Sequence, residues 1–386
     1  MRADDRSIPG IMKATGLTLV LLSAVCLWAD SLHAEEPIRI AAIFSYSGAA
    51  ADANFLSAEG ARWAVEDINA AGGVLGRRLA LIEIDTLSTP IGAKVAADIA
   101  VERQVTAIVG PSWSSHSIAV AKVAQAHKIP MIANMSTHPA LTGIGDYIFR
   151  ACYDDLLQGR AMAQFARSHL RAETVVICLD ITSDYGIGLA GSFQENFESL
   201  GGRVLKRIPY KARQSNFREM AARVKPFDPD VLFIPGYEES GAISAEAARH
   251  GVRAVPMGGD GWDADGLFRM GADRIATGYF ATHWSPAIQT PRSRAFAAKY
   301  GSRATLLAPA ALSYDAVQLL ADALRRAGTT ESSALRDALA ATQDYDGVTG
   351  RISFNPNGDP IKSLVIMEIE NGRPRYRMQV RPEHLR

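Results

Sequence analysis

The sequence predicts an α/β fold built as two similar lobes, each around its own parallel β-sheet. Short apolar runs that suit buried strands alternate with longer amphipathic stretches that suit helices, and the alternation begins again near residue 153. The chain has 386 residues, which is too many for one ordinary domain and suits two. Neither a low-complexity tract nor a long linker interrupts it, so we expect short crossings between the lobes.

The first half of the chain predicts five strands separated by helices. We expect strands at 38–44, 79–84, 107–109, 131–133 and 147–150, and helices at 59–70, 91–102 and 117–127. The strand segments are apolar and are bounded by turn residues, and they are too short to be helices. The first helix has Ala61, Ala64 and Ile68 on one face, and Gly72 and Gly73 end it.

The same alternation resumes in the second half. We expect strands at 175–179, 202–210, 231–234 and 255–257, and helices at 188–200, 217–224 and 240–250. A helix ending near residue 170 has Asp154 or Asp155 as its N-cap, since either carboxylate can accept from the first turn. Further helices are expected from 291, at 309–327 and at 332–341. Strands 351–354 and 363–370 are predicted to form an antiparallel hairpin around the turn at 355–358.

The segment 106–142 predicts a strand, a helix and a second strand, each strand being followed by a polar loop. A βαβ unit makes its two strands parallel, so the loops 110–115 and 134–138 emerge at the same edge of the sheet. Ligands of open α/β proteins bind in the crevice at that edge. Both loops carry hydroxyl groups, and the first opens a helix whose N-terminus favours negative charge. We interpret this pair of loops as half of a carboxylate-binding site.

The overall charge of the chain is balanced, because 41 Lys and Arg residues match 41 Asp and Glu residues. This balance argues against nucleic acid or an anionic membrane surface as a partner. Apolar residues make up 48% of the chain, which is enough for large cores. We expect a soluble globular protein.

The N-terminus, residues 1–34, is predicted to be a signal peptide. The apolar run 17–27 has the length of a signal-peptide core and is too short to span a bilayer, and Lys13 precedes it. Ala34 suits a cleavage point, and Met12 suits a translation start better than Met1. Cys26 raises the possibility of a lipid anchor, but the bulky Val25 before it argues against such processing. We therefore expect an exported, periplasmic protein that is not inserted in the membrane after cleavage.

Two cysteines, Cys152 and Cys178, remain after cleavage. An oxidising compartment permits a disulfide between them. However, Cys178 lies within an apolar strand, where free cysteine is a common small hydrophobic residue. We favour unpaired thiols and leave the pairing open.

Three patterns that would indicate an enzyme or a cofactor site fail on closer reading. His116, His127 and His138 are eleven residues apart, which is not the spacing of metal ligands. The glycines of segment 186–191 match GxGxxG, but six residues separate them from the preceding strand and no acid follows the next one. A G-x-S-x-G nucleophile motif is also absent. We expect no metal, no cofactor and no catalysis.

Several motifs in order along the chain resemble the leucine/isoleucine/valine-binding proteins of bacterial ABC importers. They are Ser47-Gly48, Asp67-Ile-Asn69 followed by Gly72-Gly73 and Gly76, Val109-Gly110 with Ser114-Ser115, Ile129-Pro-Met-Ile132 with Ser136-Thr137, Asp184-Tyr185-Gly186, Gly236-Tyr237, and Gly258-Gly-Asp260. The likeness covers almost all of the chain after the signal peptide.

The resemblance implies the type I periplasmic-binding fold, which has two Rossmann-like lobes with parallel sheets, a three-crossing hinge and a ligand cleft between the lobes. On that pattern, lobe 1 comprises residues 35–152 and 283–343. Lobe 2 comprises residues 153–282 and 344–386. The resemblance also implies a monomer that delivers its ligand to an inner-membrane ABC permease.

The resemblance implies a set of ligand-binding residues, namely Ser114, Ser136, Thr137, Tyr185, Tyr237 and Asp260. We add Trp113 to this set from its place in the loop 110–115, as an aromatic of the cleft wall rather than a surface cap on lobe 1. In the family, hydroxyls at the positions of Ser114, Ser136 and Thr137 hold the ligand's main-chain groups. An acid at the position of Asp260 is the counter-ion of the α-ammonium, and aromatic residues at the positions of Tyr185 and Tyr237 form the cleft wall of lobe 2. This division agrees with the chemistry, because a carboxylate needs donors and an ammonium needs acceptors.

The sequence departs from the family pattern at the side-chain pocket. Ala53 replaces a tyrosine, Trp113 replaces a smaller residue, and the cystine near the cleft of lobe 1 is missing. We therefore expect an amino acid, branched-chain or otherwise hydrophobic, without naming leucine. The alternatives are an amide, urea-like or aromatic carboxylate ligand in the same fold, or a ligand sensor for a receptor kinase.

Overall fold

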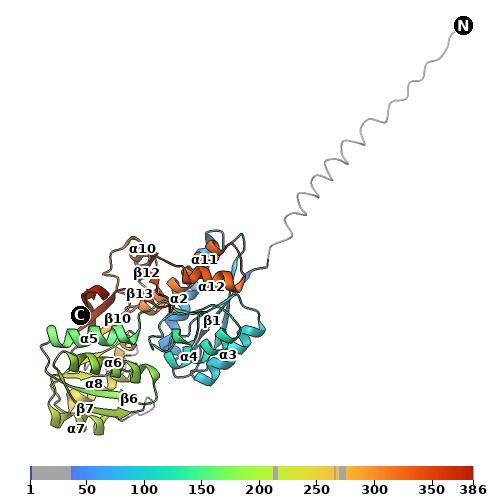
Figure 1. The fold of residues 1–386 in the computed structure, drawn as a ribbon. Coiled ribbons are helices and arrows are strands. Elements are labelled where there is room, and N and C mark those ends of the chain that lie inside the picture. The colour runs from blue at the N-terminus through green and yellow to red at the C-terminus, as the bar shows by residue number, and fades with distance from the viewer. Residues whose placement is uncertain (2–35, 212–215, 265–266, 269–274, 386) are drawn as a thin grey trace.

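The computed structural model describes residues 1, 36–211, 216–264, 267–268 and 275–385, and it shows two lobes (Figure 1). Lobe 1 is built around a five-stranded sheet and lobe 2 around a seven-stranded sheet. The expected signal peptide, residues 1–34, lies outside the described residues except for Met1. Within the described ranges, no helix combines the length and the apolarity that crossing a bilayer requires.

The sheet of lobe 1 is entirely parallel and has the strand order β2-β1-β3-β4-β5. Its strands are β1 (Ile38–Phe44), β2 (Leu79–Asp85), β3 (Ala107–Val109), β4 (Met131–Ala133) and β5 (Ile148–Arg150). The crossover helices are α2 (Ala51–Ala70), α3 (Pro90–Glu102) and α4 (Ser114–Ala126), and the later helices α10 (Pro291–Tyr300), α11 (Ala308–Ala327) and α12 (Ser332–Ala340) return to this lobe.

Strand β1 is buried on both of its faces. Ile40 and Ala42 pack on the side of α2 and α11, whereas Ala41 and Ile43 pack on the side of α3 and α4. Alternate residues of a strand point to opposite faces, so a fully apolar run needs cover on both. This arrangement confirms the predicted α/β class with helices on both faces of a parallel sheet.

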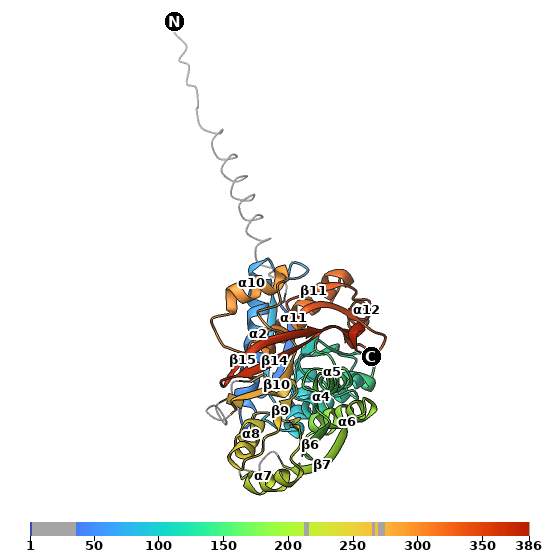
Figure 2. The same ribbon diagram turned by 90° about the vertical axis from the view of Figure 1, so that its left-hand side faces the viewer.

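Lobe 2 has a mixed sheet with the order β15-β14-β10-β9-β8-β6-β7 among the described residues. Five strands are parallel: β6 (Thr174–Asp180), β7 (Arg203–Tyr210), β8 (Val231–Phe233), β9 (Val255–Gly258) and β10 (Thr277–Thr282). The antiparallel strands β14 (Leu364–Glu370) and β15 (Arg373–Val380) extend the sheet beside β10 (Figure 2). The helices described in this lobe include α5 (Asp155–Ser168), α6 (Asp184–Ser199), α7 (Arg218–Val224) and α8 (Glu239–Arg249).

Short elements complete the described chain. The 3₁₀ turns are η1 (Thr142–Ile144), η2 (Lys225–Phe227), η3 (Asp260–Trp262) and η4 (Pro382–His384). A small sheet contains β11 (Tyr345–Gly347), β12 (Gly350–Phe354) and β13 (Pro360–Ile361). Both cysteines are free and buried, with Cys152 in a core of lobe 1 and Cys178 in a core of lobe 2.

The predicted hairpin of 351–354 with 363–370 is wrong. Strand β12 pairs instead with β13, Phe354 lying opposite Pro360, while β14 pairs with β10 in the other lobe. The turn at 355–358 returns the chain at once, because Asn355 N–H donates to Asp359 O and Gly358 N–H to Asn355 O. Two residues of pairing therefore complete the hairpin before the chain crosses to lobe 2.

The sequence reading also missed β15. Asn371 and Gly372 join β14 to β15 with positive φ angles of 52° and 74°. Asn-Gly between two strands is a strong signal of a two-residue hairpin turn. Applied to this dipeptide, the rule would have found the C-terminal strand.

Three helices begin three or more residues earlier than predicted, and one of them explains the GxGxxG match. Helix α6 begins at Asp184, with the Ser183 hydroxyl accepting from Gly186 N–H. Gly186, Gly188 and Gly191 therefore lie inside a helix, whereas a dinucleotide-binding turn lies between strand and helix. Helices α2 and α4 likewise start before residues 59 and 117.

The boundaries of the lobes remain predictions, and the packing of β12 supports moving one of them. Ile352 and Phe354 pack in the core of lobe 1, where the rings of Phe354 and Phe149 lie 5.2 Å apart. Leu364 packs in a core of lobe 2. We propose that residues 344–361 belong to lobe 1 and that the last crossing lies at residues 362–363.

Helices α2 and α11 approach each other closely at Gly60, and this contact generates a test. A Cβ atom at Gly60 would lie 2.1 Å from the Ala310 carbonyl oxygen. Alanine is favoured over glycine in helices by about 1 kcal/mol, but overpacking costs about 1–3 kcal/mol. We expect Gly60→Ala to lower the free energy of unfolding in urea. The matched control is Gly191→Ala in α6, where nothing lies within 4 Å and a gain of about 0.5–1 kcal/mol is expected. Equal effects of the two substitutions would contradict the prediction.

Candidate functional site

A small cavity lies between loops that follow strands of both sheets. Lobe 1 contributes Ala53, Ser112, Trp113, Ser114, Met135 and Pro309, and lobe 2 contributes Tyr185, Tyr237, Glu238, Asp260, Gly261, Asp263 and Ala264. Its volume of about 30 Å³ has room for about two water molecules. The lobes therefore meet closely around it, and five of the seven predicted site residues line it.

Two aromatic rings that line the cavity stack on each other across the lobes. Trp113, the residue before α4, and Tyr237, which follows β8, have ring centroids 4.5 Å apart at an angle of 19°. Tyr185 of α6 lies 5.1 Å from Tyr237, and its hydroxyl accepts from Gly261 N–H at 3.1 Å. Burial raises the pKa of both tyrosines well above the usual value, so both stay neutral. The aromatic wall is contributed by both lobes.

The wall formed by lobe 1 offers hydrogen-bond donors. Ser114 begins α4, where the first backbone N–H groups of a helix have no partner within the helix. Its hydroxyl oxygen accepts from His138 N–H at 3.3 Å, which orients the hydroxyl group. A negatively charged group is favoured at such a helix start.

Ser136 and Thr137 are buried behind the cavity and do not line it. The Ser136 carbonyl accepts from Arg150 Nη1 at 3.1 Å, and the Thr137 carbonyl accepts from Asp155 N–H at 2.8 Å. Neither hydroxyl makes a well-oriented hydrogen bond with another described residue, although that of Thr137 is close enough to lower the pKa of the Asp155 carboxyl. These two hydroxyls are the predicted site residues that the structure leaves outside the cavity.

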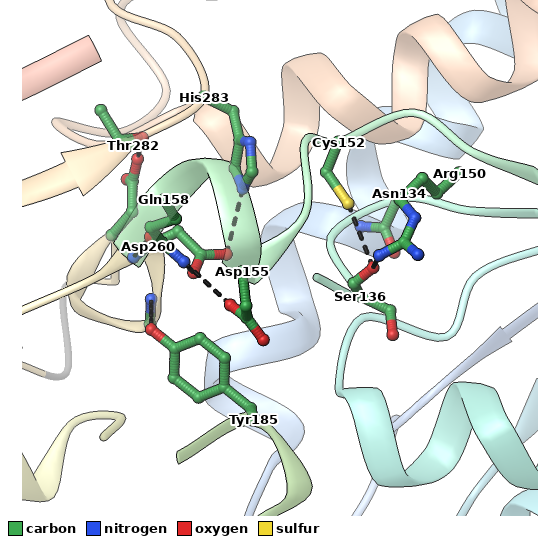
Figure 3. Close-up of polar contacts among 12 residues, drawn as sticks. Asn134, Ser136, Arg150, Cys152, Asp155, Gln158, Tyr185, Asp260, Thr282 and His283 are labelled. Atoms are coloured by element: carbon green, nitrogen blue, oxygen red, sulfur yellow. Dashed lines mark hydrogen bonds and ion pairs between the residues drawn. The ribbon is translucent and has the colours of Figure 1, made fainter. Parts of the chain in front are cut away.

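Lobe 2 contributes the buried carboxylate of Asp260, at the start of η3 after β9 (Figure 3). Gln158 Nε2 donates to its Oδ1 at 3.0 Å, and Asp260 N–H donates to Gln158 Oε1 at 2.7 Å. His283 Nε2 lies 3.0 Å from its Oδ2. Only 3% of the residue is exposed, so these partners provide the polar contacts that a buried carboxylate requires.

His283 and Asp155 set the charge around Asp260. Burial lowers the pKa of His283 below its ordinary value, although the nearby Asp260 carboxylate acts in the opposite direction. A neutral His283 donates a hydrogen bond without cancelling the negative charge. Burial, followed by the charge of Asp260, raises the pKa of Asp155 well above its ordinary value. Of these two neighbouring acids, the arrangement therefore favours a neutral Asp155 beside the Asp260 carboxylate that lines the cavity.

Gln158, Asp155 and His283 were missed as site residues at the sequence level. Gln158 contacts Asp260 across 102 residues of sequence, and no short motif marks that pairing. The sequence predicts Asp155 only as a possible N-cap, a place that Asp154 takes by accepting from Leu157 N–H at 2.9 Å. His283 directly follows β10, so the rule that sites gather at strand ends would have found it. Among the described residues, no cluster of three or more His, Cys, Asp or Glu side chains suits a metal ion.

His116 lies next to the cavity wall and predicts acid sensitivity. Burial lowers its pKa to about 4, against about 6.5 in the unfolded chain. As the pH falls between these values the unfolded state binds the proton first, so stability is lost. We expect the stability of the wild type relative to His116→Gln to fall by on the order of 3 kcal/mol between pH 7 and pH 4. Urea unfolding at both pH values checks this, with the exposed His127→Gln as control. A pH-independent difference between wild type and His116→Gln would refute it.

Known proteins resemble this chain over most of its length. The sequence profile of the periplasmic binding protein family matches residues 37–374. The Leu/Ile/Val-binding protein BraC3 of Rhizobium johnstonii is 27% identical over 347 residues, which cover 89% of this chain and 93% of that protein. The leucine-, isoleucine-, valine-, threonine- and alanine-binding protein of Pseudomonas aeruginosa is 26% identical over 342 residues, covering 87% and 90% respectively.

Solved structures agree with the fold. The leucine-binding protein LivK of Thermotoga maritima superposes with a TM-score of 0.87 at 32% identity, covering 90% of this chain and all of that one. LivJ of Streptococcus pneumoniae, solved in complex with isoleucine, gives 0.84 at 30% identity with the same coverage. These matches confirm the resemblance and the fold class predicted from the sequence. The chain belongs to the periplasmic binding protein family.

Proposed function

We propose that this protein is the solute-binding component of an ABC importer and captures an amino acid with an apolar side chain between its lobes. The observation that carries the proposal is the opposed chemistry of the cavity walls. Lobe 1 offers the hydroxyl and helix start at Ser114, and lobe 2 offers the buried carboxylate of Asp260. A zwitterion fits between donors for its carboxylate and an acceptor for its ammonium.

The rest of the cavity supports an apolar side chain. Ala53, Met135 and Pro309 line it together with the rings of Trp113 and Tyr237. Relatives named for leucine, isoleucine and valine, and a neighbour solved with isoleucine, point in the same direction. Ser136 and Thr137 lie one shell further back, and on this proposal they contact the ligand's main-chain groups when the lobes adjust around it.

Binding on this proposal operates by hinge closure, since a solute that touches both lobes stabilises the closed arrangement. A Kd on the order of 1 μM corresponds to about −8 kcal/mol. Charge-assisted hydrogen bonds of roughly 1.5–3 kcal/mol each supply this with a few contacts, after the cost of ordering.

The proposal includes a cellular setting. The protein is exported by the signal peptide at residues 1–34, acts in the periplasm as a monomer and passes its ligand to an inner-membrane permease. It performs no catalysis. Membership of the periplasmic binding protein family supports this setting.

The role of Asp260 is tested by Asp260→Ala. Removing the counter-ion leaves the ammonium without its charged acceptor, so we expect the affinity for the amino acid to fall at least about tenfold, or about 1.4 kcal/mol. Isothermal titration calorimetry measures this. Asp228→Ala is the matched control, because that carboxylate pairs with Arg253 on the surface of the same lobe. An unchanged affinity in Asp260→Ala would remove this residue from the site.

A thermal-shift screen of the twenty amino acids, small amides and aromatic carboxylates tests the ligand class. A solute that binds only the folded state raises Tm as its concentration exceeds Kd. We expect stabilisation by one or more apolar amino acids. Stabilisation by aromatic acids alone would overturn the amino-acid proposal while leaving the family assignment intact.

A further inference from the structure

Gln158 is fully buried, does not line the cavity and holds Asp260 at two points. Its Oε1 accepts from the Asp260 backbone N–H at 2.7 Å, and its Nε2 donates to Asp260 Oδ1 at 3.0 Å. One side chain therefore fixes both the main chain and the carboxylate of the same residue. Such a bidentate contact restrains the direction in which the carboxylate points.

Asp155 accepts a further hydrogen bond from the Gln158 amide. Gln158 Nε2 donates to Asp155 Oδ1 at 3.1 Å as well as to Asp260 Oδ1. With the amide reversed, its oxygen would face two carboxyl oxygens and its NH₂ group would face the Asp260 N–H. Because the reversed NH₂ group would oppose the Asp260 N–H and the reversed oxygen would oppose the Asp260 carboxylate, Asp260 permits a single orientation, and in that orientation the NH₂ group also reaches Asp155.

Asp155 also connects this cluster to the opposite lobe. Its backbone N–H donates to the Thr137 carbonyl at 2.8 Å, within the loop of lobe 1 that carries the hydroxyls of Ser136 and Thr137. Continuous hydrogen bonds thus run from Thr137 through Asp155 and Gln158 to Asp260. Figure 3 shows the side chains of Gln158, Asp155 and Asp260 gathered together beside His283.

We propose that Gln158 and Asp155 are positioning residues that aim the Asp260 carboxylate at the ligand's ammonium and tie it to the Thr137 loop. Neither side chain lines the cavity, so both act through Asp260. This inference rests on the proposed function, because it assumes an amino-acid ligand. It predicts that damage to the pair selectively lowers affinity for ligands that carry the ammonium group.

The test compares two ligands that differ only in that group, L-leucine and 4-methylpentanoate. Gln158→Met keeps a side chain of similar length and removes all three amide hydrogen bonds. Asp155→Asn keeps an oxygen toward Gln158 and is the milder variant. Gln164→Met is the matched control in the same helix, where the amide contacts the His384 carbonyl at 3.5 Å. Thermal melts without ligand establish that each variant folds.

We expect Gln158→Met to lower the calorimetric affinity for L-leucine at least about tenfold. The same substitution should lower the affinity for 4-methylpentanoate by less than about threefold. Asp155→Asn should lower the affinity for L-leucine by a smaller factor than Gln158→Met does. Gln164→Met should leave the affinity for both ligands unchanged. Since Asp155 acts through Gln158, the variant that carries both Asp155→Asn and Gln158→Met should bind L-leucine with the same affinity as Gln158→Met alone, within about twofold.

Two outcomes would overturn the inference. One is an unchanged affinity of Gln158→Met for L-leucine, and the other is an equal loss for both ligands, which would indicate a general structural role. Additive losses in the double variant would remove Asp155 from the pathway through Gln158. A wild-type protein that binds none of the twenty amino acids would instead refute the proposed function itself.

Discussion

Parallel strand pairing determines where the candidate binding residues of this protein lie. Because β1, β3 and β4 run in one direction, the loops after them emerge at one edge of the first sheet. Strands β6, β8 and β9 do the same in the second sheet. The cavity lies where the two edges meet, and each edge brings a different chemistry. Donors at the start of α4 face a buried carboxylate that follows β9.

Local pattern predicted most of the fold, and it failed where pairing depends on distant segments. Strands β3 and β4 match their predicted bounds, because short apolar runs between turns allow little else. The predicted pairing of β14 with 351–354 was wrong, because β14 pairs with β10, a strand far back in the sequence in the sheet of lobe 2, whereas the turn at 355–358 pairs β12 with the nearer β13. Helix α2 starts at Ala51 and not at the predicted residue 59. Its first turns bury Asn54, Ser57 and Ala58, which are polar or small and therefore do not give the apolar periodicity that predicts a helix.

The candidate site was predictable to the extent that it lies at strand ends. Trp113, Ser114 and Tyr237 could be found from that rule and from the family resemblance. Gln158 could not, since it lies within a helix and its role follows only from the fold that brings Asp260 beside it. Hydrogen bonds across a hundred residues leave no local trace in the sequence. The polar support of a buried charge is therefore the least predictable part of such a site.

The stacked rings of Trp113 and Tyr237 form a direct contact between the two lobes that needs no bound solute. Paired aromatic rings contribute about 0.5–1.5 kcal/mol beyond the area they bury. Because this contact does not involve a solute, it increases the fraction of ligand-free molecules that adopt the closed conformation. A larger closed population reduces the free-energy cost of reaching the conformation that binds the ligand, so the apparent affinity rises. It also makes the ligand-free and ligand-bound proteins more alike in the angle between their lobes. A partner that recognises the protein by this angle would therefore distinguish the two forms less well.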